Sequence, residues 1–135
     1  MRMEPESDPE PIARAEFETF LARGVALFNQ GEYMEAHETF ERIWVSTLDS
    51  EGDFFKGLIQ SSICLYHYSR GNPGGAKKLY SGHRRLLASF LPQHRGLDLQ
   101  SFLGAMQQTL RPVLRASDDA PPIFDQLQRP LLEQI

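Results

Sequence analysis

The sequence predicts an all-α protein of about five helices, arranged as two packed helical hairpins and a closing helix. Three observations indicate this class. Apolar residues recur at steps of three and four through most of the chain, as they do on one face of a helix. Glycine, proline and asparagine interrupt the pattern at intervals that suit helix ends. Finally, a short set of residues recurs after forty positions with its internal spacing kept.

Composition limits the number of domains and the kinds of partner. A chain of 135 residues fits one domain with one core, and 41% hydrophobic residues is ordinary for a soluble globular protein. A net charge of -4 gives no general attraction to nucleic acid or acidic membranes. Cys64 is the single cysteine, so an intramolecular disulfide is excluded. Because the N-terminus lacks an apolar signal region and no apolar run is long enough to span a bilayer, we expect a cytoplasmic protein without membrane contact.

Both ends of the chain differ in composition from its middle. Residues 1–11 alternate acidic residues with prolines, which predicts a flexible acidic tail. Residues 12–115 carry the helical pattern and form the predicted single domain. Residues 116–135 form a C-terminal extension whose apolar residues from Ile123 onward predict a short docking helix, although Pro130 argues against it.

The first hairpin is predicted from Ile12 to Thr47. Its first helix ends near Gly31, which suits the left-handed position after a helix end, and its second helix runs from about Tyr33. In the second hairpin, Asp49 or Ser50 is able to cap a helix from Phe54 to Tyr68. This helix is apolar on nearly every side, apart from a polar stripe of Gln60 and His67, and is therefore expected at the centre of the core.

The rest of the second hairpin and the closing helix follow from turn signals. Asn72 is a suitable N-cap and Pro73 a suitable first residue for a helix that ends before Pro92 and whose surface, including His83, is expected to be basic. After a loop from Pro92 to Gly96, the closing helix is predicted from about Asp98 to Leu110, or as far as Arg115.

The internal repeat links the two hairpins. A shift of forty residues moves Phe28, Gly31, Ala36 and Phe40 onto Tyr68, Gly71, Ala76 and Tyr80. This order of glycine, small residue and aromatic residue is typical of tetratricopeptide-like helical hairpins, but two copies do not make a solenoid. The polar residues around His37 are not repeated, so they are candidates for function.

Several motifs resemble one family of small prokaryotic proteins, known as domain of unknown function 309. The similar segments are Asn29-x-Gly-Glu-Tyr-x-Glu-Ala-His-Glu-x-x-Glu-x-x-Trp44, Gly57-Leu-Ile-Gln60, His67 and Gly71-Asn-Pro-x-Gly-Ala76. The resemblance covers about Phe17 to Phe90 and implies an all-helical fold. Members of the family are sometimes described as predicted metal-dependent hydrolases. Carried over to this sequence, the family pattern falls on His37, Glu38, Glu41, Trp44, Gln60, His67, Gly71 and Asn72.

Two interpretations of the polar residues stay open. His37 and Glu41 lie one helical turn apart, and His67 supplies a third ligand if the site is a catalytic zinc centre, with Glu38 as the base. Against this, His-Glu-x-x-Glu is not the zincin motif His-Glu-x-x-His. In the other interpretation, His37, Glu41, Gln60 and His67 satisfy one another as a hydrogen-bonded network between the second and third helices.

Two further residues are candidates for binding. Trp44 either covers the polar cluster or fills the core, and burial statistics favour the core. Asn72 opens a helix with free backbone N–H groups close to basic residues, which suits a small anion, although a simple helix cap is the commoner role of such a residue.

We therefore expect a module that binds a small ligand or a protein in a polar pocket between the second and third helices. The alternative is a metal-dependent hydrolase that uses His37, Glu41 and His67 with a divalent ion such as zinc. No cofactor is required by the first interpretation, and a homodimer is an open possibility.

Overall fold

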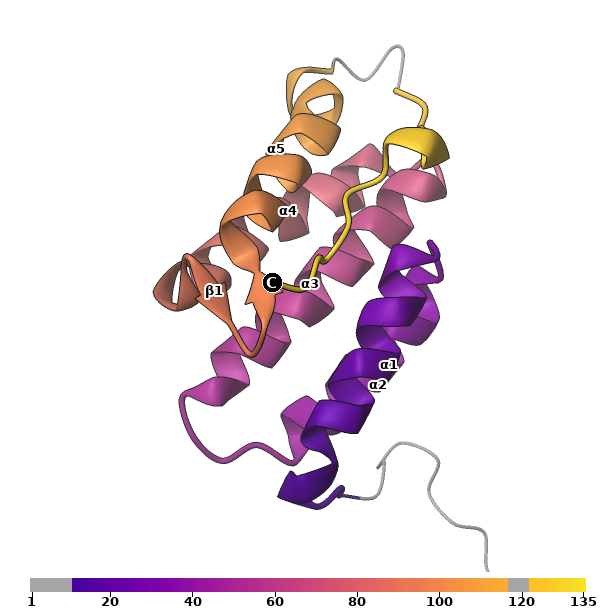
Figure 1. Cartoon of the computed structure of the whole chain (residues 1–135). Helices are drawn as coiled ribbons and strands as arrows, with labels where there is room; N and C mark the ends of the chain where they lie inside the picture. Colours follow the sequence, from indigo (N-terminus) through magenta and orange to yellow (C-terminus); the bar gives the residue numbers. More distant parts are fainter. Residues whose placement is uncertain (1–10, 117–121) are drawn as a thin grey trace, which may run out of the picture.

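The computed structural model describes residues 11–116 and 122–135, and the described chain is all-helical as predicted (Figure 1). The predicted acidic tail, except for Pro11, lies outside the described residues. The described residues form five α-helices: α1 (Phe17–Asn29), α2 (Tyr33–Val45), α3 (Glu51–Ser69), α4 (Pro73–Leu87) and α5 (Leu99–Arg115).

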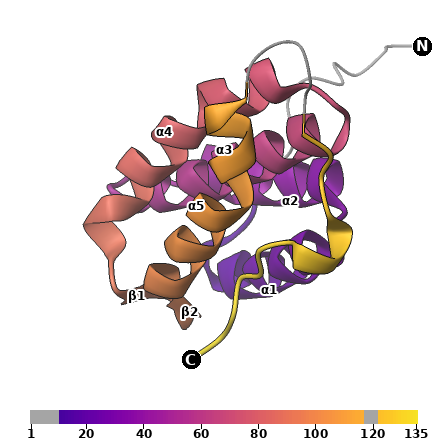
Figure 2. The same ribbon diagram turned by 90° about the horizontal axis from the view of Figure 1, so that it is seen from above.

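The helices pack in the order in which they follow one another. α1 packs on α2, α2 on α3 and α3 on α4, so that the chain forms two hairpins side by side, and α5 packs against α4. Figure 2, seen from above, shows α3 enclosed by the other helices. Ten residues of α3 are buried, among them Phe54, Phe55 and Leu58, which confirms the prediction that this helix is the centre of the core.

The two hairpin turns have the same backbone hydrogen bonds. At the end of α1, Gly31 N–H donates to Phe28 O and Glu32 N–H to Leu27 O, at 2.9 Å each. At the end of α3, Gly71 N–H donates to Tyr68 O at 3.1 Å and Asn72 N–H to His67 O at 2.8 Å. Both glycines have a positive φ, 84° and 75°. This is the Schellman arrangement of a helix end, and it repeats at the spacing found in the sequence.

The packing behind these turns follows the repeated small residues. Ala36 and Ala76 are both fully buried, which lets the second helix of each hairpin approach the first closely. Phe28 and Phe40 are also fully buried, whereas Tyr80 is half-buried. The repeat is therefore a repeat of backbone and of small residues, with different large side chains filling the two interiors.

Two predictions about the second half of the chain are wrong. Residues 92–96, expected to be a loop, contain part of a small antiparallel pair, β1 (Gln93–His94) and β2 (Leu97–Asp98). The docking helix expected after Ile123 is only a 3-10 turn, Gln126–Gln128, and the chain is extended beyond it. Pro130 explains this, because a residue before proline is driven out of the helical region, and Arg129 has the extended ψ of 144°.

His83 also departs from the sequence prediction. It was expected on the basic surface of α4, but its side chain is fully buried and its Nδ1 hydrogen-bonds to Tyr80 O. Burial lowers the pKa of His83 to about 4, so the ring is neutral at pH 7. Among the described residues, its Nε2 atom has no hydrogen-bond partner. In the repeat, His83 occupies the position of Ile43, which is equally buried.

Candidate functional site

The structure brings two of the predicted ligands together on α2. His37 Nε2 and Glu41 Oε2 lie 2.8 Å apart, and the side chains are 21% and 43% exposed. Nδ1 of His37 is buried and has no hydrogen-bond partner among the described residues. Glu38, the predicted base, is exposed on the same helix. The pair is therefore a partly exposed contact within a single helix.

Gln60 and His67 face α4 and not α2. A Cβ atom on Gly75 would lie 2.7 Å from His67 Cγ, and one on Gly82 would collide with Gln60 Oε1. The two glycines, seven residues apart, thus receive the two polar side chains, also seven residues apart on α3. The predicted polar stripe of α3 exists, but it packs against α4, whereas the sequence predicted contact with α2.

The three predicted metal ligands are consequently not assembled. His67 accepts a hydrogen bond from the Asn72 side-chain amide at 3.3 Å, while His37 pairs with Glu41. In the part of the chain that the structure describes, no three His, Cys, Asp or Glu side chains are grouped so as to hold a metal ion. The α2–α3 network of the other interpretation is not formed either, since its α3 members turn toward α4.

The two predicted binding residues have simpler roles. Asn72 Oδ1 accepts a hydrogen bond from Gly75 N–H at 3.0 Å and so caps α4. Trp44, favoured as a core residue, is 36% exposed, and Lys56 Nζ lies 5.5 Å from its ring centroid. The preference for the core was wrong here because the turn of α2 that carries Trp44 lies at the end of the hairpin, where the chain leaves for α3.

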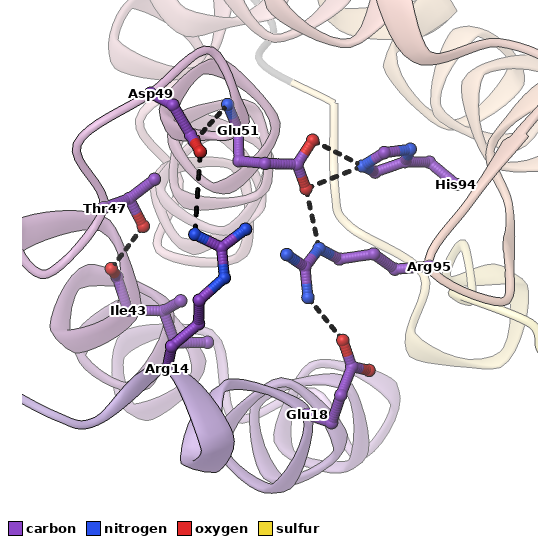
Figure 3. A network of polar contacts seen from close by, with 8 residues as sticks. All are labelled: Arg14, Glu18, Ile43, Thr47, Asp49, Glu51, His94 and Arg95. Carbon is purple, nitrogen blue, oxygen red and sulfur yellow. Dashed lines mark hydrogen bonds and ion pairs between the residues drawn. The ribbon is translucent and has the colours of Figure 1, made fainter.

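A different cluster of charged residues forms a cleft at this end of the molecule (Figure 3). The cleft has a volume of about 210 Å³ and lies where the start of α1, the α2–α3 connection and the β1–β2 turn meet. We call it the Arg95 cleft. Its lining residues are Arg14, Phe17, Ser46, Thr47, Leu48, Asp49, Glu51 and Arg95.

Glu51, the first residue of α3, connects the cleft to the β1–β2 turn. Its carboxylate accepts hydrogen bonds from His94 Nε2 at 2.8 and 2.9 Å and from Arg95 Nε at 2.7 Å. Burial raises the pKa of Glu51, but the hydrogen bonds and charges of Arg95 and His94 outweigh it and lower the pKa below its ordinary value. The carboxylate is thus ionised at neutral pH and fixes both neighbours.

Arg95 stands at a position that is unusual for an arginine. It has φ 48° and is followed by Gly96 with φ 78°, a tight turn in which asparagine, aspartate or glycine is preferred. The left-handed conformation costs other residues roughly 1–2 kcal/mol. Here Arg95 joins three elements, because its Nη1 also pairs with Glu18 on α1 and its guanidinium lies 5.2 Å from the Phe55 ring.

The opposite wall of the cleft is less tightly paired. Arg14 Nη1 lies 3.8 Å from Asp49 Oδ2, and the Arg14 side chain is 77% exposed. The other oxygen of Asp49 accepts a hydrogen bond from Glu51 N–H at 3.0 Å, which holds the carboxylate at the start of α3. Figure 3 shows the two guanidinium groups reaching into the same space from different elements.

The residues of this site are far apart in the chain, so no local pattern in the sequence predicts it. Glu51 and Arg95 are 44 positions apart, and Glu18 and Arg95 are 77 apart. The available signal was small: a charged residue directly before Gly96, in a segment that we interpreted as a loop, and Asp49, which we considered only as a helix cap. No periodicity connects these positions, so only the packing of the hairpins brings them together.

Taken together, the fold and the site define a small all-helical domain with a repeated hairpin and a charged cleft at one end. Residues 21–79 match the model of the family described as Domain of unknown function (DUF309). The resemblance drawn from the motifs is thus confirmed for residues 21–79, the segment that runs from α1 into α4.

The relatives are themselves uncharacterised. The uncharacterized protein YpuF of Bacillus subtilis (strain 168) is 34% identical over 82 residues, which are 56% of this chain and 45% of that protein. An uncharacterized protein of Aquifex aeolicus (strain VF5) is 25% identical over 84 residues, 62% of this chain and 25% of that protein. The matched segments thus span less than half of these relatives. Within the described residues, every helix is too short or too polar to cross a lipid bilayer.

Proposed function

We propose that the protein binds a small ligand in the Arg95 cleft, and that this ligand carries a carboxylate and an amino group. The observation that carries the proposal is the convergence of two arginines, Arg14 and Arg95, on one cleft. Guanidinium groups bind carboxylates through paired hydrogen bonds, and such charge-assisted bonds are among the strong ones in proteins.

Both arginines have donors to offer a ligand. Arg14 is largely exposed and its ion pair with Asp49 is long, at 3.8 Å. Arg95 uses Nε and Nη1 for Glu51 and Glu18, and no hydrogen bond from its Nη2 is found among the described residues. Each guanidinium group therefore has N–H donors left for a ligand in the cleft, while the paired atoms of Arg95 hold its side chain in position.

The charge balance of the lining selects the kind of ligand. Two arginines are matched by two carboxylates, Asp49 and Glu51, so a multiply charged anion would meet repulsion. A zwitterion avoids this, because its carboxylate reaches Arg14 and Arg95 while its amino group reaches Asp49. The volume of about 210 Å³ corresponds to roughly seven water molecules, which is enough for a small amino acid.

The hydrolase alternative receives no support from this arrangement. Its predicted ligands His37, Glu41 and His67 are divided between two sites, and Glu38 is exposed away from any group of three ligands among the described residues. The Arg95 cleft lies at the α2–α3 connection, but its lining residues are other than those predicted for a pocket between the second and third helices.

An NMR titration of uniformly ¹⁵N-labelled protein tests the proposal. Glycine, β-alanine and 4-aminobutyrate provide zwitterions of increasing length, and acetate and inorganic phosphate serve as anions without an amino group. We expect saturable shifts at the amides of residues 46–51 and of Arg95 with at least one zwitterion, and weaker binding of both anions. Arg14→Gln should reduce the affinity at least tenfold without changing the fold, since its side chain is 77% exposed.

Arg111→Gln is the matched control, because Arg111 is exposed on α5. It should bind as the unchanged protein does. Equal binding by the Arg14→Gln variant, or no saturable shift with any probe, would contradict the proposal. Preferred binding of phosphate would show an anion site without a place for an amino group.

A further inference from the structure

The C-terminal segment runs between α1 and α5 (Figures 1 and 2), and we call the surface of the two helices and β2 that it covers the channel. Its main chain is held there by a single side chain of α1. Asn29 Nδ2 donates to Leu132 O at 2.9 Å, and Asn29 Oδ1 accepts from Leu132 N–H at 2.8 Å. An amide that binds both polar groups of one residue recognises extended backbone, whatever side chain that residue has.

The edge of β2 continues this recognition of the main chain. Asp98 N–H donates to Glu133 O at 2.9 Å, and Ile135 N–H donates to Gly96 O at 3.0 Å. Leu97 and Gln134 form an antiparallel bridge. The segment thus extends the edge of β2 by one isolated bridge, and many domains bind extended peptides by similar main-chain pairing at a strand edge.

Two side chains add selectivity to these backbone contacts. Leu132 is only 1% exposed and belongs to the core, whereas its neighbour Leu131 is 40% exposed. Three residues earlier, Arg129 Nε donates to the Asn29 carbonyl oxygen at 2.9 Å. The channel therefore contacts an arginine and, three positions later, a leucine.

The segment does not fill the channel. On the α1 side, a groove of about 430 Å³ runs between the segment and Ala22, Val25 and Ala26. On the α5 side, a groove of about 320 Å³ is lined by Ser101, Ala105 and Thr109 among others. Because open grooves flank the segment on both sides, its detachment does not require the helices to separate.

From these contacts we infer that the channel between α1 and α5 is a docking site for an extended peptide with an Arg-x-x-Leu sequence. Residues 129–135 occupy it as an internal copy of that peptide. A peptide from a partner protein replaces the internal copy through the same contacts with Asn29 and the β2 edge. Because the internal copy is covalently attached, its effective concentration is high, and an external peptide binds well only when the copy is weakened.

Matched variants of the full chain test this inference. The probe is a fluorescein-labelled synthetic peptide with the sequence of residues 122–135, and binding is measured by fluorescence anisotropy. Leu132→Ala removes the anchor of the internal copy and should raise the affinity for the probe at least tenfold. Leu131→Ala makes the same truncation at the exposed neighbour and should leave the affinity unchanged.

A second pair of variants tests the role of α1. In the Leu132→Ala background, Asn29→Ala should lower the affinity for the probe at least tenfold, whereas Gln30→Ala, at an exposed position, should not. A probe in which its own leucine at position 132 is replaced by alanine should not bind. The inference is overturned if a helical Leu132→Ala variant binds no better than the unchanged protein, or if a scrambled peptide binds equally well.

Hydrogen exchange of the unchanged protein gives an answer even if Leu132→Ala does not fold. If the segment detaches on its own, the amides of Asp98, Leu132 and Ile135 exchange faster than the amides in the middle of α1. If they exchange only when the whole domain unfolds, the segment is a fixed part of the core and the inference is wrong.

Discussion

The two helical hairpins have the same turn geometry but fill their interiors with different side chains. In the first hairpin the glycine lies on the first helix, where a Cβ atom on Gly24 would come within 2.7 Å of Phe40 Cδ1. In the second hairpin, Gly75 and Gly82 lie on the second helix and receive His67 and Gln60, while Gly57 on the first helix receives Leu87. The first hairpin is thus closed by an aromatic ring, and the second by two polar side chains and a leucine.

This comparison shows which features of a helical hairpin are tightly constrained. The positive φ of Gly31 and Gly71 and the burial of Ala36 and Ala76 are common to both, because the turn and the close approach of the helices require them. The large residues differ, because any complementary pair of large and small side chains fills the space. The second hairpin thereby holds two polar side chains, Gln60 and His67, in half-buried positions.

The largest expected difference concerns the aromatic residues that correspond in the two hairpins. Phe40→Ala removes a fully buried ring and should reduce the free energy of unfolding by about 3–5 kcal/mol. Tyr80→Ala should cost about 1–2 kcal/mol, because Tyr80 is half-buried. Urea denaturation followed by circular dichroism measures both. Equal losses would mean that the two interiors are equally packed.

The next difference concerns His83 and its counterpart Ile43. Burial lowers the pKa of His83 from 6.5 to about 4, so the unfolded chain takes up a proton first as the pH falls. The stability contributed by the neutral ring is present above pH 6.5 and is lost between pH 6.5 and about 4, by roughly 3 kcal/mol at most. His83→Ile copies the first hairpin and should remove this loss.

The measurement is urea denaturation at several pH values between 4 and 7, for the unchanged protein and the variant. The carboxylates of the Arg95 cleft are present in both proteins, so their contribution cancels in the difference between the two curves. A difference that is independent of pH would show that His83 does not titrate in this range.

The smallest expected difference concerns the residues at the start of the second helices. Asn72 caps α4 through Gly75 N–H, whereas the side chain of Glu32, at the same place before α2, makes no capping hydrogen bond. Asn72→Ala should lower the free energy of unfolding by about 1 kcal/mol, and Glu32→Ala should change it much less. Thermal unfolding of the two variants is sufficient to compare them, and a similar loss in both would contradict the assignment of the cap.

Local signals explain why so much of the fold was predictable. Gly31, Gly71, Asn72 and Pro73 mark helix ends through conformational preferences that act within a few residues. The apolar surface of α3 predicts its burial without knowledge of its neighbours. By contrast, the packing of the whole domain decides which neighbouring helix a given face contacts. Gln60 and His67 of α3 were predicted to contact α2, but they contact α4.

The candidate sites, unlike the helices and turns, could not be predicted from local patterns in the sequence. The sequence by itself determined the all-helical class, the two hairpin turns and the central place of α3, because helix periodicity and turn preferences are local. Only the tertiary structure decided that Glu51 meets His94 and Arg95, and that Asn29 holds Leu132. These contacts join residues between 43 and 103 positions apart, and no local pattern encodes such pairs, since they form only when the helices have packed.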